Sequence, residues 1–239
     1  MVKPAAVPGR PRSRDAAGLP AVTPEKIISS ALELTARHGL EGWTLRQLAG
    51  AVDAYPAVVY HHVGDREAVV SAVVERVIAV VPVPQADLPW REWFRILLAD
   101  LRSVLTGYPG VARRLALYGA TSTAAATIVD RGVRTLQAGG FGDEAPTVYR
   151  LLLNTACLFL SAEDEQHRNA ALKERTGELL AEFRDDPDRP GLAAMGVALH
   201  DLLSDPERRL NYFADFYDYS VERCLDGVSS RLAVLGAAH

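Results

Sequence analysis

Residues 55–62 form a short run of aromatic and imidazole side chains with almost no charge. Tyr60, His61 and His62 can donate hydrogen bonds to phosphates or base edges, and Ala57 and Val58 can touch thymine methyl groups. Adjacent helical residues point about 100° apart, so the two histidines cannot easily chelate one ion, and we expect no metal site. The run suits a helix that enters the major groove of DNA.

Helix signals surround this run. One helix opens at Thr23 and ends at Gly39, Thr44 caps a second, Pro56 starts a third and Asp65 caps a fourth. Short helices bury little surface individually, so we expect the first three to pack as one small domain against the longer fourth helix. Backbone N–H groups at the starts of the second and fourth helices also favour phosphate.

Three segments together resemble the helix-turn-helix of the TetR-family transcriptional regulators, most closely the tetracycline-repressor branch. They are Thr44–Ala49, Tyr60–Val63 and Arg66–Val69. The resemblance implies a dimer that binds a palindromic, double-stranded DNA operator and releases it when a small effector binds. Ligand binding would tilt the fourth helix and change the spacing of the two recognition helices.

The resemblance also implies roles for single residues. Arg46 matches an arginine that reads a guanine, and His61 matches an aromatic residue that approaches bases. Tyr60, His62 and Arg66 match positions that contact the DNA backbone. The residues expected at the DNA are Thr44, Arg46, Gln47, Tyr55, Pro56, Ala57, Val58, Tyr60, His61, His62 and Arg66.

The corner before the third helix departs from the family pattern, because Asp53-Ala54-Tyr55 stands where Gly-Val-Ser is common. Asp tolerates the left-handed backbone conformation less readily than Gly, and Tyr55 is a poor helix cap. Pro56, Ala57 and Val58 offer no hydrogen-bonding side chain. An alternative is therefore a ligand-binding module of the same fold with weak or lost DNA recognition.

Composition suits one or two folded domains in 239 residues, 49% of them hydrophobic. The net charge of −4 is uneven: residues 1–80 hold 9 Lys/Arg against 8 Asp/Glu, and residues 81–239 hold 17 against 22. Residues 1–22 read as a disordered basic arm, which is either a plain tail or an additional DNA contact. We expect no membrane span, no secretory signal and a cytoplasmic location, with Cys157 and Cys224 as reduced thiols.

The rest of the chain has helical periodicity, so the fold class is all-α. A three-helix DNA-binding domain, 23–70, is joined by a long helix to a larger helical domain for ligand binding and dimerisation, 71–230. The helices expected in the second domain span 88–105, 111–118, 123–136, 144–160, 168–184, 192–203 and 208–225.

The second domain is rich in aromatic and apolar residues, which we expect to line an effector pocket or to form ordinary core. The pocket candidates are Trp90, Trp93, Phe94, Tyr108, Arg114, Tyr118, Cys157 and Phe159. Ala138–Phe141 and Glu163–His167 also resemble the tetracycline repressor. Its ligand-handling histidines are absent from Val80–Pro82 and Val111–Arg114, so we expect a more apolar effector, no metal and no cofactor.

The helices at 144–160 and 208–225 are those that such regulators pair across a dimer axis. The expected interface residues are Tyr149, Leu152, Leu153, Tyr212, Phe213, Phe216, Tyr217 and Val221. An enzyme is the remaining alternative, because His167 stands at helical spacing from Glu163 and Asp164 as a possible base and orienting group. No nucleophile motif or cofactor loop accompanies them, so we expect no enzymatic activity.

Overall fold

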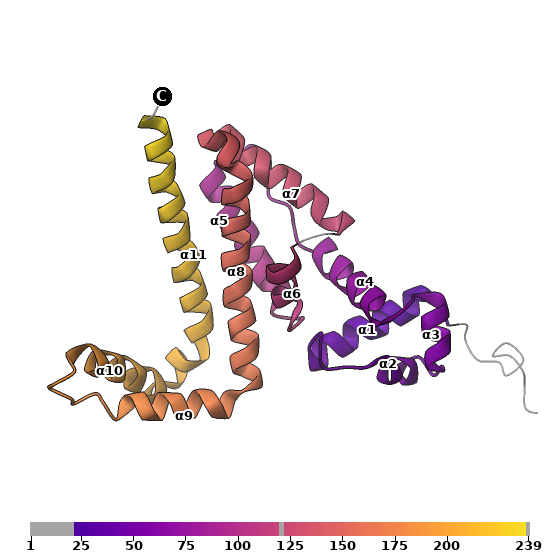
Figure 1. Cartoon of the computed structure of the whole chain (residues 1–239), viewed down its shortest axis with the longest axis horizontal. Coiled ribbons are helices and arrows are strands. Elements are labelled where there is room, and N and C mark those ends of the chain that lie inside the picture. The colour runs from indigo at the N-terminus through magenta and orange to yellow at the C-terminus, as the bar shows by residue number, and fades with distance from the viewer. Residues whose placement is uncertain (1–21, 120–121, 238–239) are drawn as a thin grey trace, which may run out of the picture.

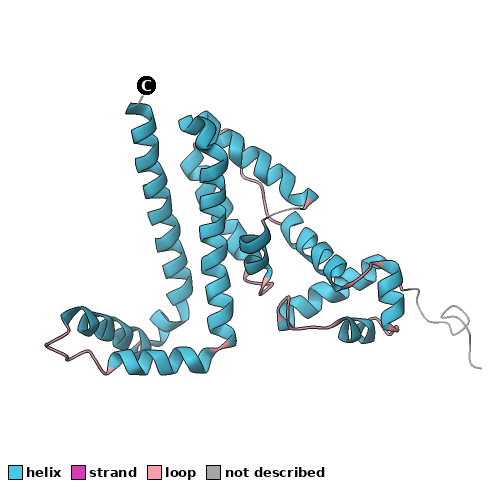
Figure 2. Cartoon of the chain, in the orientation of Figure 1, coloured by secondary structure: helices cyan, strands magenta, loops and turns pink. Residues whose placement is uncertain are grey.

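The computed structural model describes residues 22–119 and 122–237, which contain helices and no strand (Figure 2). The all-α fold class is confirmed, while residues 1–21 of the expected arm lie outside the described residues. The helices are α1 (Pro24–His38), α2 (Leu45–Ala51), α3 (Pro56–His62), α4 (Arg66–Ala79), α5 (Trp90–Leu105), α6 (Val111–Tyr118), α7 (Thr123–Leu136), α8 (Ala145–Arg168), α9 (Ala170–Ala181), α10 (Pro190–Ser204) and α11 (Pro206–Ala237). Two tight turns, Gln137–Phe141 and Gly142–Glu144, connect α7 to α8.

Helices α1 to α4 form the head at one side of the molecule (Figure 1). Thr23 Oγ1 accepts a hydrogen bond from the Lys26 amide at 3.2 Å, and Asp65 accepts one from the Ala68 amide at 2.9 Å. At α2 the Gln47 side chain accepts from the Thr44 amide at 2.8 Å, which completes a capping box. The predicted starts of all four helices are therefore confirmed.

Trp43 anchors the centre of the head. Its side chain is buried, and its indole Nε1 donates to Thr35 Oγ1 at 2.9 Å. Thr35 in turn donates to the Ala31 carbonyl oxygen at 2.8 Å, so no polar atom of this chain of contacts is left unpaired. Leu48 of α2 and Val59 of α3 are fully buried beside it, and this fixes the faces that α2 and α3 leave exposed.

The remaining helices form the body, in which α8 and α11 lie side by side and the hairpin of α9 and α10 projects from their feet (Figure 1). Both long helices exceed their expected ranges: α8 reaches Arg168 and α11 reaches Ala237. Gly227, Ser229 and Ser230 are weak helix formers, which favoured an earlier end for α11. None of the described helices is long and apolar enough to cross a bilayer.

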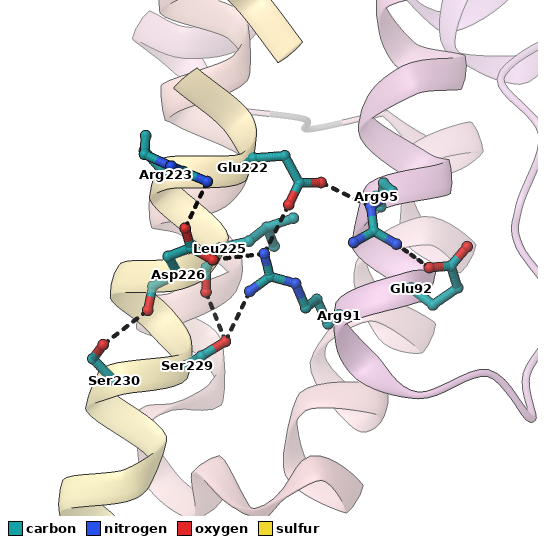
Figure 3. A network of polar contacts seen from close by, with 9 residues as sticks. All are labelled: Arg91, Glu92, Arg95, Glu222, Arg223, Leu225, Asp226, Ser229 and Ser230. Atoms are coloured by element: carbon teal, nitrogen blue, oxygen red, sulfur yellow. Dashed lines mark hydrogen bonds and ion pairs between the residues drawn. The ribbon is translucent and has the colours of Figure 1, made fainter. Parts of the chain in front are cut away.

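Contacts with α5 account for the longer α11, as Figure 3 shows. The Arg91 guanidinium donates to Glu222 and Asp226 at 2.7 Å and to the Ser229 hydroxyl at 3.1 Å. Arg95 donates to Glu222 at 2.7 Å, and this hydrogen bond lowers the pKa of the Glu222 carboxyl. Tertiary hydrogen bonds thus hold this half of α11 where its intrinsic propensity is weak.

Candidate nucleic-acid interface and ligand cavity

The outer surface of α2 and α3 presents most of the residues expected at the DNA. Tyr55 is 80% exposed and Tyr60 is 62% exposed, and the neighbouring His61 and His62 rings meet edge to face at 5.5 Å. The exposed members of the set are Thr44, Arg46, Gln47, Tyr55, Pro56, Ala57, Tyr60, His61 and His62. Val58 differs, since it is half-buried against the core of the head.

The corner between α2 and α3 adopts the left-handed backbone conformation, which Asp tolerates less readily than Gly. Asp53 has a φ of 52° and is the single non-glycine residue with positive φ in the described ranges. Tyr55 makes no side-chain cap to α3, as its residue type predicts. The corner therefore keeps a helix-turn-helix geometry without the usual glycine.

Arg46 and Arg66, the two arginines of the head that we expect at the DNA, lie in different surroundings. Arg66 donates to the Leu40 carbonyl oxygen at 2.8 Å and to the Glu41 carboxylate at 3.1 Å, and its guanidinium stacks 5.1 Å from the centre of the Trp43 ring. These contacts tie Arg66 to the α1–α2 loop, and its expected contact to the DNA backbone stays a prediction. Arg46 is exposed, and its side chain makes no hydrogen bond or ion pair within the described residues.

A cavity of about 420 Å³ lies in the body between α5, α6, α7 and α8, beneath the end of α4. Drug-sized ligands commonly occupy cavities of roughly 300–1,000 Å³. The lining residues are Ile78, Leu97, Leu101, Leu115, Ala116, Leu117, Tyr118, Gly119, Ala125, Ile128, Tyr149, Arg150, Leu153, Asn154 and Cys157.

Two of the eight residues expected in the pocket, Tyr118 and Cys157, line this cavity. Trp93 and Phe94 are fully buried in the core and do not line it. The other four also lie outside the cavity lining. Trp90 packs on Phe141 with ring centres 5.2 Å apart, and Phe159 packs on Phe216 at 5.4 Å. Tyr108 lies in the turn between α5 and α6, and the Arg114 guanidinium stacks on the Tyr118 ring. Large aromatic residues thus filled the core, and aliphatic residues enclose most of the cavity.

On the α8 wall of the cavity, Cys157 is the only pocket residue that was expected from the sequence, and Arg150 and Asn154 were missed. Arg150 and Asn154 are polar interruptions four residues apart in an apolar helix, and that interruption was the available signal. Burial raises the pKa of Cys157 to about 12 and also raises the pKa of Tyr149, so both groups are neutral near pH 7. No cluster of three or more metal-ligating side chains occurs in the described part of the chain.

The residues expected at a dimer interface fall into three groups. Leu152, Tyr217 and Val221 are buried in the core of a single chain, and Tyr149 and Leu153 line the cavity. Tyr212, Phe213 and Phe216 form an aromatic cluster on α11, in which Phe216 stays 44% exposed. The large apolar residues exposed on α8 and on this part of α11 are Leu151, Leu158, Phe216 and Tyr219.

The acid–base pair considered for an enzyme is not formed. Glu163 binds Arg102 through hydrogen bonds of 2.6 and 3.1 Å, and Asp164 accepts a hydrogen bond from the Gly110 amide at 2.7 Å. His167 packs edge to face on Phe213, with ring centres 5.0 Å apart. Both carboxylates therefore have structural partners other than the histidine.

Helix α6 joins the cavity to the head. Its last turn lines the cavity, and Arg114 in its middle forms an ion pair with Glu67 of α4. Directly before α6, the Pro109 carbonyl oxygen accepts a hydrogen bond from the Leu40 amide of the head at 2.7 Å. Gly110 has a φ of 90°, and a Cβ atom there would lie 3.1 Å from Leu40 Cβ, so glycine permits this close approach.

Comparisons with known proteins agree with this arrangement. No family model matches the chain. An HTH-type transcriptional regulator of Saccharopolyspora erythraea is 32% identical over 127 residues, which are 52% of each protein, so the match spans about half the length of that relative. The structure of apo ActR from Streptomyces coelicolor superposes with a TM-score of 0.71 at 21% identity, covering 91% of this chain and 98% of ActR.

Two further structures bear on the two sites. ActR in complex with actinorhodin has a TM-score of 0.66 at 21% identity, over 86% of this chain and 96% of ActR. BioQ of Mycobacterium smegmatis with its double-stranded DNA operator has a TM-score of 0.56 at 20% identity, over 75% of this chain and 98% of BioQ. These matches establish a shared fold.

Proposed function

We propose that this chain, which has the fold of the TetR-family regulators, is a DNA-binding transcriptional regulator controlled by a small effector. The observation that carries the proposal is the position of α6, which is both a wall of the cavity and a neighbour of the head. A ligand that displaces Tyr118 also moves Arg114, whose guanidinium lies 5.3 Å from the Tyr118 ring and pairs with Glu67. The effector then releases DNA if it binds the displaced arrangement more tightly.

The relatives support the same proposal. A related structure holds actinorhodin and another holds an operator. By analogy we place α3 in the major groove, with Arg46 as the main hydrogen-bonding reader of a base. We further propose repression as the mode of control, with the effector relieving it.

A homodimer is part of this proposal, because two heads bind a palindromic site far better than one. Leu151 and Leu158 are exposed, stand seven residues apart and therefore share one face of α8. Leu151→Glu should convert a dimer to a monomer in analytical ultracentrifugation. Leu179→Glu, on the exposed surface of α9, is the matched control and should leave the dimer intact.

Gel shifts with the DNA upstream of the chain's own coding region test the DNA-binding function. We expect salt-sensitive binding that a scrambled sequence does not compete. Arg46→Ala should cost about 1–3 kcal/mol and relax the preference at one base position. Arg37→Ala, an exposed arginine on α1, should change neither.

One observation favours a second candidate, a ligand-binding module with weak or lost DNA recognition. The first turn of α3 holds Pro56, Ala57 and the half-buried Val58, none of which has a hydrogen-bonding side chain. Absence of specific, salt-sensitive binding to any operator fragment would support this candidate over the regulator.

A further inference from the structure

The walls of the cavity differ in chemistry. Leu97, Leu101, Leu115 and Ile128 from α5, α6 and α7 make three walls apolar. The fourth wall is α8, where polar side chains are interleaved with apolar ones. Tyr149, Arg150, Asn154 and Cys157 all reach the cavity from this one helix. A bound molecule would therefore meet most of the hydrogen-bonding side chains on one side, with the Tyr118 hydroxyl of α6 as the exception.

Among the residues that the structure describes, Arg150 is the only charged side chain that lines the cavity, and no Asp or Glu lines it. Within the described residues the side chains of Arg150 and Asn154 make no hydrogen bond or ion pair. The cavity thus holds one positive charge without a counter-charge.

Arg150 and Asn154 stand four residues apart, so their side chains are neighbours on one face of α8. A guanidinium offers two parallel N–H donors that match a carboxylate, and an adjacent amide can donate a further hydrogen bond. Arg150 itself is exposed at the rim, where its free charge remains solvated until a ligand arrives. A cation would meet the positive charge of Arg150 with no carboxylate among the lining residues to offset it, and a neutral acceptor would gain weaker hydrogen bonds from Arg150 than an anion would.

We propose that the effector is an organic anion, with an apolar ring body and one acidic group. The body lies between the leucines and Ile128, and the acidic group binds Arg150 and Asn154. This inference rests on the proposed function, because it names the class of molecule that the regulator senses. It also narrows the expectation of a largely apolar effector, since the acidic group supplies the specificity.

A matched pair of fluorescent probes tests the inference. Anilinonaphthalene sulfonate carries an acidic group on an aromatic body, and N-phenylnaphthylamine has the same body without the acid. We expect the unmodified protein to bind the sulfonate at least about tenfold more tightly, which is the order of a charge-assisted hydrogen bond. Equal affinities, or tighter binding of the neutral probe, would overturn the proposal.

Three variants locate the effect. Arg150→Gln should remove the preference for the sulfonate and leave the affinity for the neutral probe unchanged. Arg113→Gln removes the same charge from an exposed position on α6 outside the cavity, and should change neither affinity. Ala116→Phe fills the cavity and should weaken both probes. If the Arg150→Gln variant still prefers the sulfonate over the neutral probe, or if the Ala116→Phe variant still binds the sulfonate as tightly, the anion does not bind to Arg150 in this cavity.

The binding assay contains no DNA, so its result is independent of the gel shifts. If the unmodified protein shows no preference for the sulfonate but binds an operator specifically, the proposal of an organic-anion effector is wrong and the proposed regulatory function stands. A sulfonate preference that depends on Arg150, in a protein that binds no operator, would support an anion-binding module of the same fold. Since Arg150 is exposed, its substitution should leave the fold unchanged, which circular dichroism can verify.

Discussion

In the head, the side chains of Thr44, Asp65 and Arg66 form hydrogen bonds with other groups of the head. On α8, by contrast, Arg150 and Asn154 line the cavity and make no hydrogen bond or ion pair within the described residues. Thr44, Asp65 and Arg66 each satisfy backbone groups or a loop within about 26 residues of sequence. On α8 these groups face walls contributed by four other helices, α4, α5, α6 and α7. The difference is that these three residues of the head have their partners within the head, whereas Arg150 and Asn154 keep free hydrogen-bonding groups at the cavity.

The largest expected effect concerns Cys157, which shares the α8 wall. Its pKa rises from 9.0 to about 12 on burial, so at pH 8 its thiolate fraction should be about a thousandfold smaller than that of an unshifted thiol. Iodoacetamide should therefore label the half-buried Cys224 much faster than Cys157, as measured by mass spectrometry of the peptides. Equal labelling rates would mean that this wall is open to water.

The same pKa shift has a consequence for stability. Because the folded-state pKa of Cys157 is raised, its contribution to stability is fully present below about pH 9 and is lost as the pH rises towards 12. Urea unfolding at increasing pH should show this decline. Cys157→Ala should reduce the slope in that window, and Cys224→Ala should leave it unchanged.

The next largest effect should separate the core of the head from its DNA-facing surface. Trp43→Ala removes a buried indole and leaves Thr35 without its partner, so we expect a loss of about 3–5 kcal/mol in the free energy of unfolding. Tyr60→Ala, on the exposed surface of α3, should stay within about 0.5 kcal/mol. Urea denaturation followed by circular dichroism measures both, and similar losses for the two would contradict the placement of Trp43.

A smaller expected effect on stability distinguishes Arg66 from Arg46. Arg66→Ala should lower the free energy of unfolding by about 1–2 kcal/mol, because the Leu40 carbonyl and Trp43 lose their partner. Arg46→Ala should leave stability within about 0.5 kcal/mol and act on DNA binding alone. If Arg66→Ala weakens DNA binding with unchanged thermal stability, Arg66 contacts DNA after all.

The smallest effect concerns the end of α11. Arg91→Ala removes the hydrogen bonds to Glu222, Asp226 and Ser229, and should cost about 1 kcal/mol locally. Amide hydrogen exchange in residues 227–237 should accelerate about fivefold, since each 1.4 kcal/mol is tenfold. Arg223→Ala is the control, because Arg223 pairs with Asp226 inside α11 and should change exchange less.

Local chemistry explains why much of the fold was predictable. A cap side chain acts within three residues of its own position, so Thr23, Thr44 and Asp65 define helix starts that no distant contact needs to confirm. The apolar period likewise predicted α6 and α7 with their observed bounds. The exposure of most residues expected at the DNA followed too, because exposure on a short amphipathic helix depends on its own spacing.

Only the tertiary structure decided the roles that depend on distant partners. Arg66 is tied to the α1–α2 loop because the Leu40 carbonyl and Trp43 lie beside it, and Trp93 became core because helices pack around it on every side. The cavity lies among five helices and has aliphatic walls, so the richness of one segment in aromatic residues did not locate it. The sequence by itself determined the starts of the first four helices and the exposed faces of α2 and α3, because both depend on neighbours along the chain. The placement of Arg150 at a cavity required the packing of segments that are far apart in sequence.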